Sequence, residues 1–288
     1  MFTRLERFYD AVPRDGAVAE DIGDLVLFVR KGAGWPYYAR PRLAAERTPS
    51  AADITAVRQR QREVGAPEAF EWVHETTPDL LAVARSAGLS VLLAPLMVLE
   101  RAALLPDLPL PDATIRLLDP ASPSFDTDLS ISRAVGHLGF SAPAPAPGPV
   151  PLSELPPGGI PGSPVAGPAE RDAYPPADPE VIAEQRRLIA SGRLTTGVVE
   201  SPTEGILASG SVQRVGTVAE VVGVATLPSA RRRGYASQLT ATLARDAAED
   251  GVDLVFLSAG DDDVARLYSR VGFRRIGTAC IAEPSATI

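Results

Sequence analysis

The fold is read most directly from residues 220–236, which have the sequence EVVGVATLPSARRRGYA. The apolar start predicts a strand that ends at Thr226, because Pro228 cannot continue a strand. A turn containing Gly234 leads directly into a predicted helix over residues 236–249. Amides at a helix start have no intrahelical acceptor and, with the helix dipole, form an anion site suited to a pyrophosphate.

Small and basic residues accompany this turn. Gly234 lets the backbone approach an anion closely, and Ala236 is small for the same reason. Arg231, Arg232 and Arg233 add positive charge beside it. The alternative is an exposed basic turn with no ligand, but the strand–turn–helix context favours the anion site. A Walker A lysine and a Gly-x-Gly-x-x-Gly run at a strand end are both absent from the sequence, which disfavours mononucleotide and dinucleotide sites.

The flanking sequence predicts one mixed α/β unit. Residues 142–180 contain 13 prolines and five glycines and are interpreted as an extended loop inside this unit. Three strands in an antiparallel meander come next, followed by a helix and a strand buried on both faces. The expected strands cover 114–118, 195–200, 205–213, 217–226, 254–259 and 273–282, and the expected helices cover 130–140, 178–191, 236–249 and 264–271.

The preceding residues predict a second, smaller α/β domain. Helix 50–64 begins with Ser50 and Asp53, which resemble a capping box. Strand 69–75, helix 79–87 and strand 89–99 then repeat the strand–helix–strand ending of the chain, with Gly88-Leu89 falling where Gly272-Phe273 falls. A further strand is expected at 24–30. We therefore expect domains at 1–108 and 109–288, the proline-rich loop belonging to the second.

Two spaced motifs of the second domain resemble the GNAT superfamily of acetyl-CoA-dependent N-acetyltransferases. The family signature Gln/Arg-x-x-Gly-x-Gly/Ala matches Arg231–Ala236, preceded by Pro228. A second block, an alanine followed by Leu-Tyr and Gly-Phe, matches Ala265, Leu267-Tyr268 and Gly272-Phe273. The resemblance covers about residues 112–288 and implies a mixed, mostly antiparallel sheet flanked by helices. The N-terminal domain is then a degenerate half-domain of the same kind, the alternative being an unrelated small α/β domain.

The resemblance implies an acetyl-CoA site and an amine acceptor. The backbone of Val224, Ala225 and Thr226 would pair with the pantetheine arm, and the thioester would lie where strands 217–226 and 254–259 splay apart. The pyrophosphate would be held by the turn and helix start, with cofactor contacts from Arg231, Arg232, Arg233, Gly234, Tyr235, Ala236 and Ser237. Asp262 stands where relatives often carry a cofactor-contacting asparagine, so this sequence departs from the pattern there.

The resemblance also implies two proton-transfer roles. Tyr268 is the expected general acid for the departing thiolate, against the alternative of an aromatic packed in the core. Glu220 lies 11 residues before Arg231, a spacing that resembles the branch in which a glutamate acts as base through water. Its alternative is an edge carboxylate facing solvent. In the N-terminal repeat, Ala84 occupies the position of Tyr268 and cannot donate a proton. The N-terminal domain is therefore expected to bind no cofactor. It is expected to pack on the catalytic domain, either as a wall of the acceptor pocket or as an extension of the catalytic domain's sheet.

The predicted function is transfer of an acetyl group from acetyl-CoA to a primary amine by direct attack, and the proline-rich loop is expected to help cover the acceptor site. The alternative is a non-catalytic acyl-CoA-binding or regulatory module. The acceptor's identity and the oligomeric state stay open.

Composition narrows the partners further. The net charge of −8 and a pI near 5.0 disfavour nucleic acid and anionic membranes as partners. One cysteine, Cys280, and two histidines exclude an intrachain disulfide and a His-rich or Cys-rich metal centre, so no metal cofactor is expected. The sequence has no apolar run long enough for a membrane span and no secretory signal, which predicts a cytoplasmic protein. A single lysine among 28 basic residues is typical of a GC-rich bacterial genome.

Overall fold

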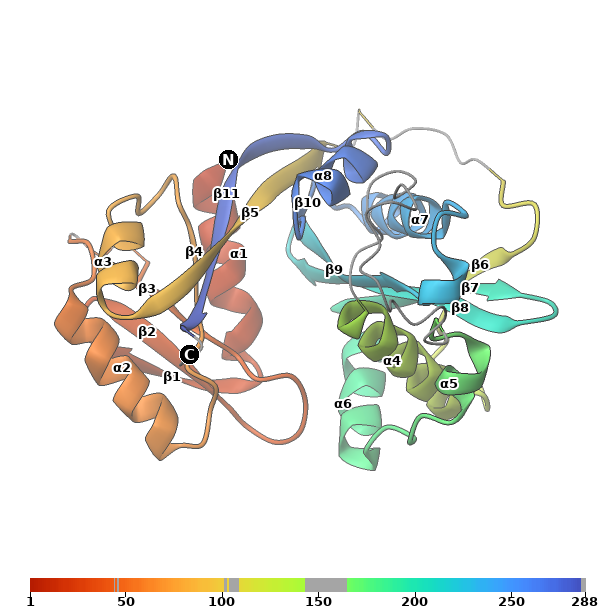
Figure 1. Cartoon of the computed structure of the whole chain (residues 1–288), viewed down its shortest axis with the longest axis horizontal. Coiled ribbons are helices and arrows are strands. Elements are labelled where there is room, and N and C mark those ends of the chain that lie inside the picture. The colour runs from red at the N-terminus through yellow and green to blue at the C-terminus, as the bar shows by residue number, and fades with distance from the viewer. Residues whose placement is uncertain (44, 46, 101–102, 104–108, 143–164, 286–288) are drawn as a thin grey trace, which may run out of the picture.

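The computed structural model describes the chain except residues 44, 46, 101–102, 104–108, 143–164 and 286–288. Its strands form one 11-stranded sheet in the order β1-β2-β3-β4-β11-β5-β10-β9-β8-β7-β6. Figure 1 shows two halves joined through β5 and β11, with the N-terminal half (residues 1–100) on the left. The expected mixed, mostly antiparallel sheet flanked by helices is confirmed, and the sheet runs through both halves.

The C-terminal half (residues 109–285) follows the predicted element order with one correction: the short helix α5 lies inside the segment 142–180 that was interpreted as an extended loop, because Pro168 occupies the first turn of that helix, where a proline is tolerated. Its strands are β6 (Thr114–Leu117), β7 (Leu194–Ser201), β8 (Gly205–Val215), β9 (Val218–Thr226), β10 (Leu254–Ser258) and β11 (Arg274–Pro284). Its helices are α4 (Phe125–Ser141), α5 (Pro168–Asp172), α6 (Pro179–Ala190), the 3-10 turn η3 (Pro228–Ala230), α7 (Tyr235–Glu249) and α8 (Asp262–Ser269). Helix α7 covers one face of β7–β9, and α4, α5 and α6 lie on the other (Figure 1). The antiparallel meander β7-β8-β9 is confirmed.

The N-terminal half contains the predicted elements and three that the sequence analysis missed. Its strands are β1 (Ala17–Ile22), β2 (Leu25–Arg30), β3 (Ala39–Pro41), β4 (Phe70–Val73) and β5 (Leu89–Glu100). Its helices are α1 (Phe2–Arg14), α2 (Ala51–Glu63) and α3 (Leu80–Ser86). The missed elements are α1, β1 and β3. Helix α1 buries Leu5, Phe8 and Tyr9 at helical spacing, a pattern that the sequence contains.

The two strand–helix–strand repeats, β4-α3-β5 and β10-α8-β11, exchange their last strands. Strand β11 lies between β4 and β5 and is antiparallel to both, while β5 lies between β11 and β10. Each half therefore receives a sheet strand from the repeat of the other half. The position of β11 also decides where its side chains are buried: Cys280 and Ala282 belong to the core beneath α2 and α3.

The domain boundary predicted at 108/109 falls on residues that the structure does not describe, and the division into 1–108 and 109–288 stays a prediction. Because β11 pairs with strands of the first half, a division by sequence position separates strands that are hydrogen-bonded neighbours.

Candidate active site

The start of α7 carries a left-handed turn and no capping side chain. Gly234 is the N-cap residue, with φ of 84°, and Arg232 has φ of 68°. The first intrahelical bond of this turn runs from the Gln238 amide to the Gly234 carbonyl oxygen (3.2 Å). The amides of Tyr235, Ala236 and Ser237 precede it and are oriented along the helix axis toward the turn. A Cβ atom on Gly234 would meet no described atom within 4 Å, so open space lies over the turn.

The three arginines of the turn have different surroundings. Arg231 donates from Nη2 to the carbonyl oxygens of Gly139 (2.6 Å) and Ala142 (3.3 Å), at the end of α4. Arg233 pairs with Glu204 (3.0 Å) and stacks over Tyr235. Arg232 is exposed and makes no ion pair with any residue that the structure describes. The expected positive charge at the anion site therefore comes most directly from Arg232.

Strand β9 bends where the sequence analysis placed the thioester. Ser209 pairs with Ala225 and Ser211 pairs with Val222, so Gly210 of β8 faces two residues of β9. Gly223 takes φ of 63° in this bulge, a conformation that favours glycine. The bulge bends the strand away from its neighbour.

The parallel pairing of β9 with β10 ends just before this bend, since it covers only Val218–Glu220. The two strands therefore separate beyond Glu220. Ala225 and Thr226, past the bulge, pair only with β8 among the described strands, and helix α4 packs closely on them. A Cβ on Gly139 would lie 2.9 Å from the Ala225 Cβ atom.

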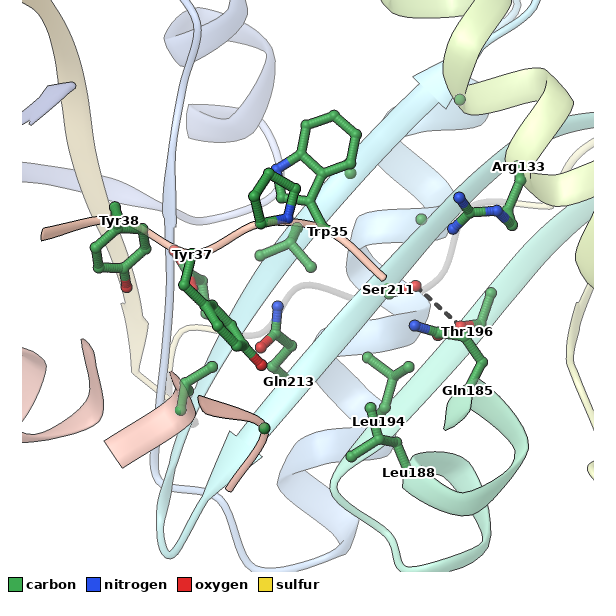
Figure 2. A pocket seen from close by; sticks show the side chains of 18 of the residues that line it. Trp35, Tyr37, Tyr38, Arg133, Gln185, Leu188, Leu194, Thr196, Ser211 and Gln213 are labelled. Atoms are coloured by element: carbon green, nitrogen blue, oxygen red, sulfur yellow. Dashed lines mark hydrogen bonds between the residues drawn. The ribbon is translucent and has the colours of Figure 1, made fainter. Parts of the chain in front are cut away.

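A cavity of about 1090 Å³ opens between the two halves and reaches this bend. Val222 and Gly223 of β9 and Ser258 at the end of β10 line it. Figure 2 shows the aromatic side chains of the 35–38 loop on one side, and Arg133, Gln185, Thr196, Ser211 and Gln213 on the other. The Thr196 and Ser211 hydroxyls are hydrogen-bonded to each other across β7 and β8 (2.9 Å).

Trp35, at the edge of the cavity, is 82% exposed. The clustered aromatic residues of the stretch Trp35–Tyr38 would by themselves favour a core or turn cluster. All four residues of the stretch instead line the cavity between the halves.

Glu220 lies at the inner end of this cavity, next to groups from the N-terminal half. Burial raises its pKa to about 8, the charge of Glu71 adds to the rise, and a hydrogen bond with Tyr9 opposes it. Glu71 itself has its pKa raised to about 7, mainly by burial. Arg40 is almost fully buried beside them and forms an ion pair with Glu6. Glu220 is thus an enclosed carboxyl group rather than an edge group facing bulk solvent.

Tyr268 lies on the other face of the sheet. Its ring is 8% exposed and packs against Phe273 in the core under α7. Burial raises the pKa of its phenol to about 12, and the Thr240 hydroxyl acts in the opposite sense. Tyr268 is not among the residues that line the cavity. The structure therefore brings Glu220, but not Tyr268, into the cavity.

The acidic residues before α8 have structural partners. Asp261 caps the helix by accepting a hydrogen bond from the Val264 amide (2.8 Å). Asp262 pairs with Arg275 (3.1 Å). Among the described residues, no three His, Cys, Asp or Glu side chains gather where they could hold a metal ion. In the same part of the chain, no helix is both long and apolar enough to cross a membrane.

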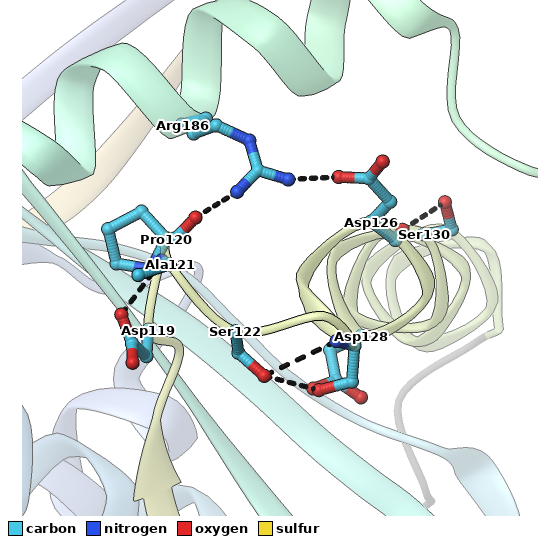
Figure 3. A network of polar contacts seen from close by, with 9 residues as sticks. Asp119, Pro120, Ala121, Ser122, Asp126, Asp128, Ser130 and Arg186 are labelled. Atoms are coloured by element: carbon cyan, nitrogen blue, oxygen red, sulfur yellow. Dashed lines mark hydrogen bonds and ion pairs between the residues drawn. The ribbon is translucent and has the colours of Figure 1, made fainter.

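The second part of the proline-rich segment, from residue 165, is described and is tied to α4. Helix α6 begins at the end of this segment, and Figure 3 shows its Arg186 donating to the Pro120 carbonyl oxygen and to Asp126 at the start of α4. Tyr174 packs against His137 of α4 (centroids 4.9 Å apart), and both line the cavity. Residues 143–164 of the predicted covering loop lie outside the described part of the chain.

Tyr9, Arg40 and Glu71 are residues of the cavity that the sequence analysis missed. Glu71 carried one signal, because it is a lone carboxylate inside the apolar stretch Phe70–Val73. Arg40 and Tyr9 carried none, since their meeting with Glu220 depends on how the two halves pack. The sheet extension by the N-terminal half is confirmed, and that half also walls the cavity.

Comparisons with known proteins agree with this architecture. Residues 195–282 match the model of the family described as FR47-like protein. A search of curated protein sequences found no significant match. Among solved structures, a GCN5-related N-acetyltransferase from Kribbella flavida aligns over 99% of this chain and 96% of its own, with 19% identity and a TM-score of 0.67.

Two further structures show how far the likeness extends. A GCN5-related N-acetyltransferase from Sphaerobacter thermophilus aligns over 97% of this chain and 84% of its own (14% identity, TM-score 0.53). A tandem GNAT protein from the clavulanic acid biosynthesis pathway aligns over 92% and 79% (15% identity, TM-score 0.50). The fold of this chain, N-terminal half included, is therefore that of GCN5-related N-acetyltransferases.

Proposed function

We propose that this protein transfers an acetyl group from acetyl-CoA to a primary amine. The observation that carries the proposal is the course of one segment: β9 separates from β10 beside a cavity that Gly223 lines, and the same strand leads on to the uncapped start of α7. A pyrophosphate at the α7 amides leaves the thioester arm to follow the free edge of β9 toward Gly223. The acceptor amine would then come from the cavity.

In this proposal the cofactor is bound mainly by backbone. The amides from Arg232 to Ser237 hold the pyrophosphate, and Arg232 adds a charge. Arg231 and Arg233 position the turn through α4 and Glu204 rather than reaching the ligand themselves. Val224, Ala225 and Thr226 offer backbone groups to the pantetheine arm. Asp262, already paired with Arg275, is the weakest of the proposed cofactor contacts.

Glu220 is the proposed base. An acceptor ammonium must lose a proton before its nitrogen can attack the thioester carbon, and a water molecule can relay that proton to the carboxylate. A carboxyl with a pKa of about 8 is a better proton acceptor than an ordinary one, but it is ionised only as the pH rises through that value. Activity should therefore increase from about pH 6 to about pH 9.

Tyr268 is the proposed acid. Collapse of the tetrahedral intermediate breaks the carbon–sulfur bond, and the thiolate must be protonated. A phenol with a pKa of about 12 stays protonated at neutral pH and keeps a proton to donate. Because the Tyr268 hydroxyl is buried under α7, this role requires the thioester sulfur to enter the space between β9 and β10.

The second candidate is a non-catalytic acyl-CoA-binding or regulatory module, favoured by the separation of Tyr268 from the cavity. Two measurements discriminate between the candidates: calorimetric titration with acetyl-CoA and release of free thiol with a panel of primary amines. Binding with amine-dependent thiol release supports the enzyme. Binding without release for any amine supports the module, and no binding at millimolar acetyl-CoA rejects both. A bacterial, cytoplasmic setting also remains a proposal.

A further inference from the structure

We propose that Glu71 of the N-terminal half and Glu220 of the C-terminal half together bind the ammonium group of the acceptor, so that the two halves share one amine site. The inference rests on the proposed function. It assigns to the N-terminal half a direct contact with substrate, beyond packing and walling the cavity.

The strand pattern places both carboxyl groups on the same face of the sheet. In β4, Phe70 and Trp72 belong to the core beneath α2 and α3, so the alternation of a strand turns Glu71 to the face that α1 covers. In β9, Ala219 and Val221 belong to the core beneath α7, so Glu220 is also turned to the α1 face. Both side chains line the same cavity.

Helix α1 connects the two carboxyl groups. Tyr9 packs its ring edge-on against Phe256 of β10 (centroids 5.3 Å apart), and its hydroxyl lowers the pKa of Glu220. The charges of both Glu71 and Glu220 act on the Tyr9 phenol, whose pKa burial raises well above its usual value. Tyr38 donates to the Tyr9 carbonyl oxygen (3.4 Å). The pair is therefore enclosed by aromatic rings on the N-terminal side.

The charged groups around Glu71 and Glu220 include more carboxyl groups than cations. Arg40 is the one cation that lowers the pKa of both carboxyl groups in the described part of the chain, and it already pairs with Glu6. One guanidinium thus faces three carboxyl groups, Glu6, Glu71 and Glu220. Of the other arginines that line the cavity, Arg187, Arg193 and Arg214 are paired with carboxylates. Arg30 donates to carbonyl oxygens and Arg133 makes no ion pair with a described residue, but neither is among the groups that shift the pKa of Glu71 or Glu220. Buried carboxylates without a cation either take up protons or bind a cation.

An ammonium group from the acceptor is a cation, and it also carries a proton that a carboxylate can take up. Its positive charge compensates the pair when it binds, and its proton then passes to Glu220, which leaves a neutral amine and a protonated carboxyl group. The amine nitrogen attacks the thioester carbon, the carbon–sulfur bond breaks, and the second proton that the nitrogen loses replaces the one that Tyr268 gives to the departing thiolate. Glu71 keeps its charge through this step and stabilises the ammonium against early loss to solvent. The cavity's aromatic side chains Trp35 and Tyr37 fit an acceptor with an apolar body behind the amine.

The test uses benzylammonium chloride as the probe and benzyl alcohol as its neutral counterpart, with the full-length protein and saturating CoA. At about pH 8.5 we expect Glu71→Gln to weaken benzylammonium binding by about tenfold or more, which corresponds to about 1.4 kcal/mol. Benzyl alcohol binding and the acetyl-CoA dissociation constant should stay unchanged. Glu184→Gln is the matched control, because Glu184 lines the same cavity but is paired with Arg187 (2.8 Å).

The pH profile separates an electrostatic role from a structural one. Removing the charge of Glu71 lowers the pKa of Glu220, because that charge contributes to its rise. The pH midpoint for benzylammonium binding should therefore move to lower pH in Glu71→Gln, and Glu71→Asp should restore most of the affinity. The remaining charged or titratable neighbours of the pair are Glu6, Tyr9, Tyr38, Arg40 and Glu283.

The possible outcomes are distinct. Equal losses for benzylammonium and benzyl alcohol in Glu71→Gln, or an unchanged pH midpoint, would overturn the shared amine site while leaving acetyl-CoA binding intact. Wild-type protein that binds benzylammonium no better than benzyl alcohol above about pH 8 would overturn it as well. If the wild-type protein does not bind acetyl-CoA, the proposed function itself is contradicted.

Discussion

Two helix starts occupy equivalent places in the two halves and differ in how their amides are satisfied. Helix α2 follows β3 as α7 follows β9. At α2, Ser50 accepts a bond from the Asp53 amide (3.2 Å) and Asp53 accepts one from the Ser50 amide (2.8 Å), a complete capping box. At α7, the N-cap is Gly234 and no side chain caps the helix.

Under the proposed function, this difference explains why α7 would bind a pyrophosphate and α2 would not. The capping box of α2 places a carboxylate where a phosphate would have to bind, and it uses the amides that a phosphate would need. The two strand–helix–strand repeats also differ at the position of the proposed general acid: the N-terminal repeat has Ala84 where the C-terminal repeat has Tyr268. The proposed function therefore predicts that the N-terminal half binds no cofactor, although it shares the strand–helix–strand pattern of the C-terminal half.

The largest effect on acetyl-CoA binding is expected from a change that removes the open turn at the start of α7. We expect Gly234→Val to abolish the single acetyl-CoA site of each chain. Losing two charge-assisted amide bonds of about 2 kcal/mol each weakens binding by about 1000-fold. Isothermal titration measures the effect. Gly216→Val is the matched control, because Gly216 also has a positive φ (57°) and open space around its Cβ position.

Both glycine variants should lose similar stability, about 1–2 kcal/mol, because each forces a β-branched residue into the left-handed region. The control should keep its acetyl-CoA site. Two sites per chain in the wild type, or tight binding by Gly234→Val, would show that α7 is not the distinguishing helix start.

The second test concerns the tyrosine that the N-terminal repeat lacks. Tyr268→Phe should lower kcat by about 100-fold, the usual contribution of a general acid, and leave the acetyl-CoA dissociation constant unchanged. The ring keeps its packing against Phe273, so thermal unfolding should be nearly unaffected. Full activity in this variant would assign Tyr268 to the core alone.

A smaller effect is expected from the capped helix. Ser50→Ala should lower the free energy of unfolding by about 1 kcal/mol, because it leaves an amide of α2 without its acceptor. Urea unfolding followed by circular dichroism measures it, and acetyl-CoA binding serves as the second readout and should not change. Ser90→Ala is the control, since Ser90 is exposed and its hydroxyl makes no hydrogen bond with a described residue. Equal losses in both variants would contradict the role of the capping box.

The smallest expected effect on binding comes from Arg232, which is compared with Arg231 of the same turn. Arg232→Ala should weaken acetyl-CoA binding only about two- to fivefold, since an exposed charge near a helix start contributes about 0.5–1 kcal/mol. The loss should shrink at high salt. Arg231→Ala should instead lower the free energy of unfolding, because it frees carbonyl oxygens at the end of α4. A larger binding loss for Arg231→Ala than for Arg232→Ala would reverse the two roles.

Local patterns predicted most of the elements because their causes are local. The capping box at Ser50, the meander of the C-terminal half and the buried strand β10 all depend on residues close together in the sequence. Helix α4 was predicted to begin at residue 130, but it begins at Phe125. Its first turn was missed because polar residues lie among the apolar ones there and obscure the helical pattern.

The strand exchange and part of the site could not be predicted, because their causes lie far apart in the chain. The repeat of strand–helix–strand was visible, but nothing in the sequence of β11 says that it will pair with β4 and β5. Similarly, the turn at Gly234 was predicted from its own residues, whereas the bond from Arg231 to Gly139 spans 92 positions. That Glu71 and Glu220 line one cavity depends on distant residues in the same way.

The exchange of β5 and β11 also sets an order of events during synthesis. Strand β11 leaves the ribosome after every other strand described here, yet it completes the sheet and the core of the half that is made first. Until then β4 and β5 are separated by an empty place, and Leu92 and Leu93 border an unpaired edge. Contacts between segments so distant form slowly, so we expect the sheet of the N-terminal half to stay incomplete for longer during synthesis than its length alone would require.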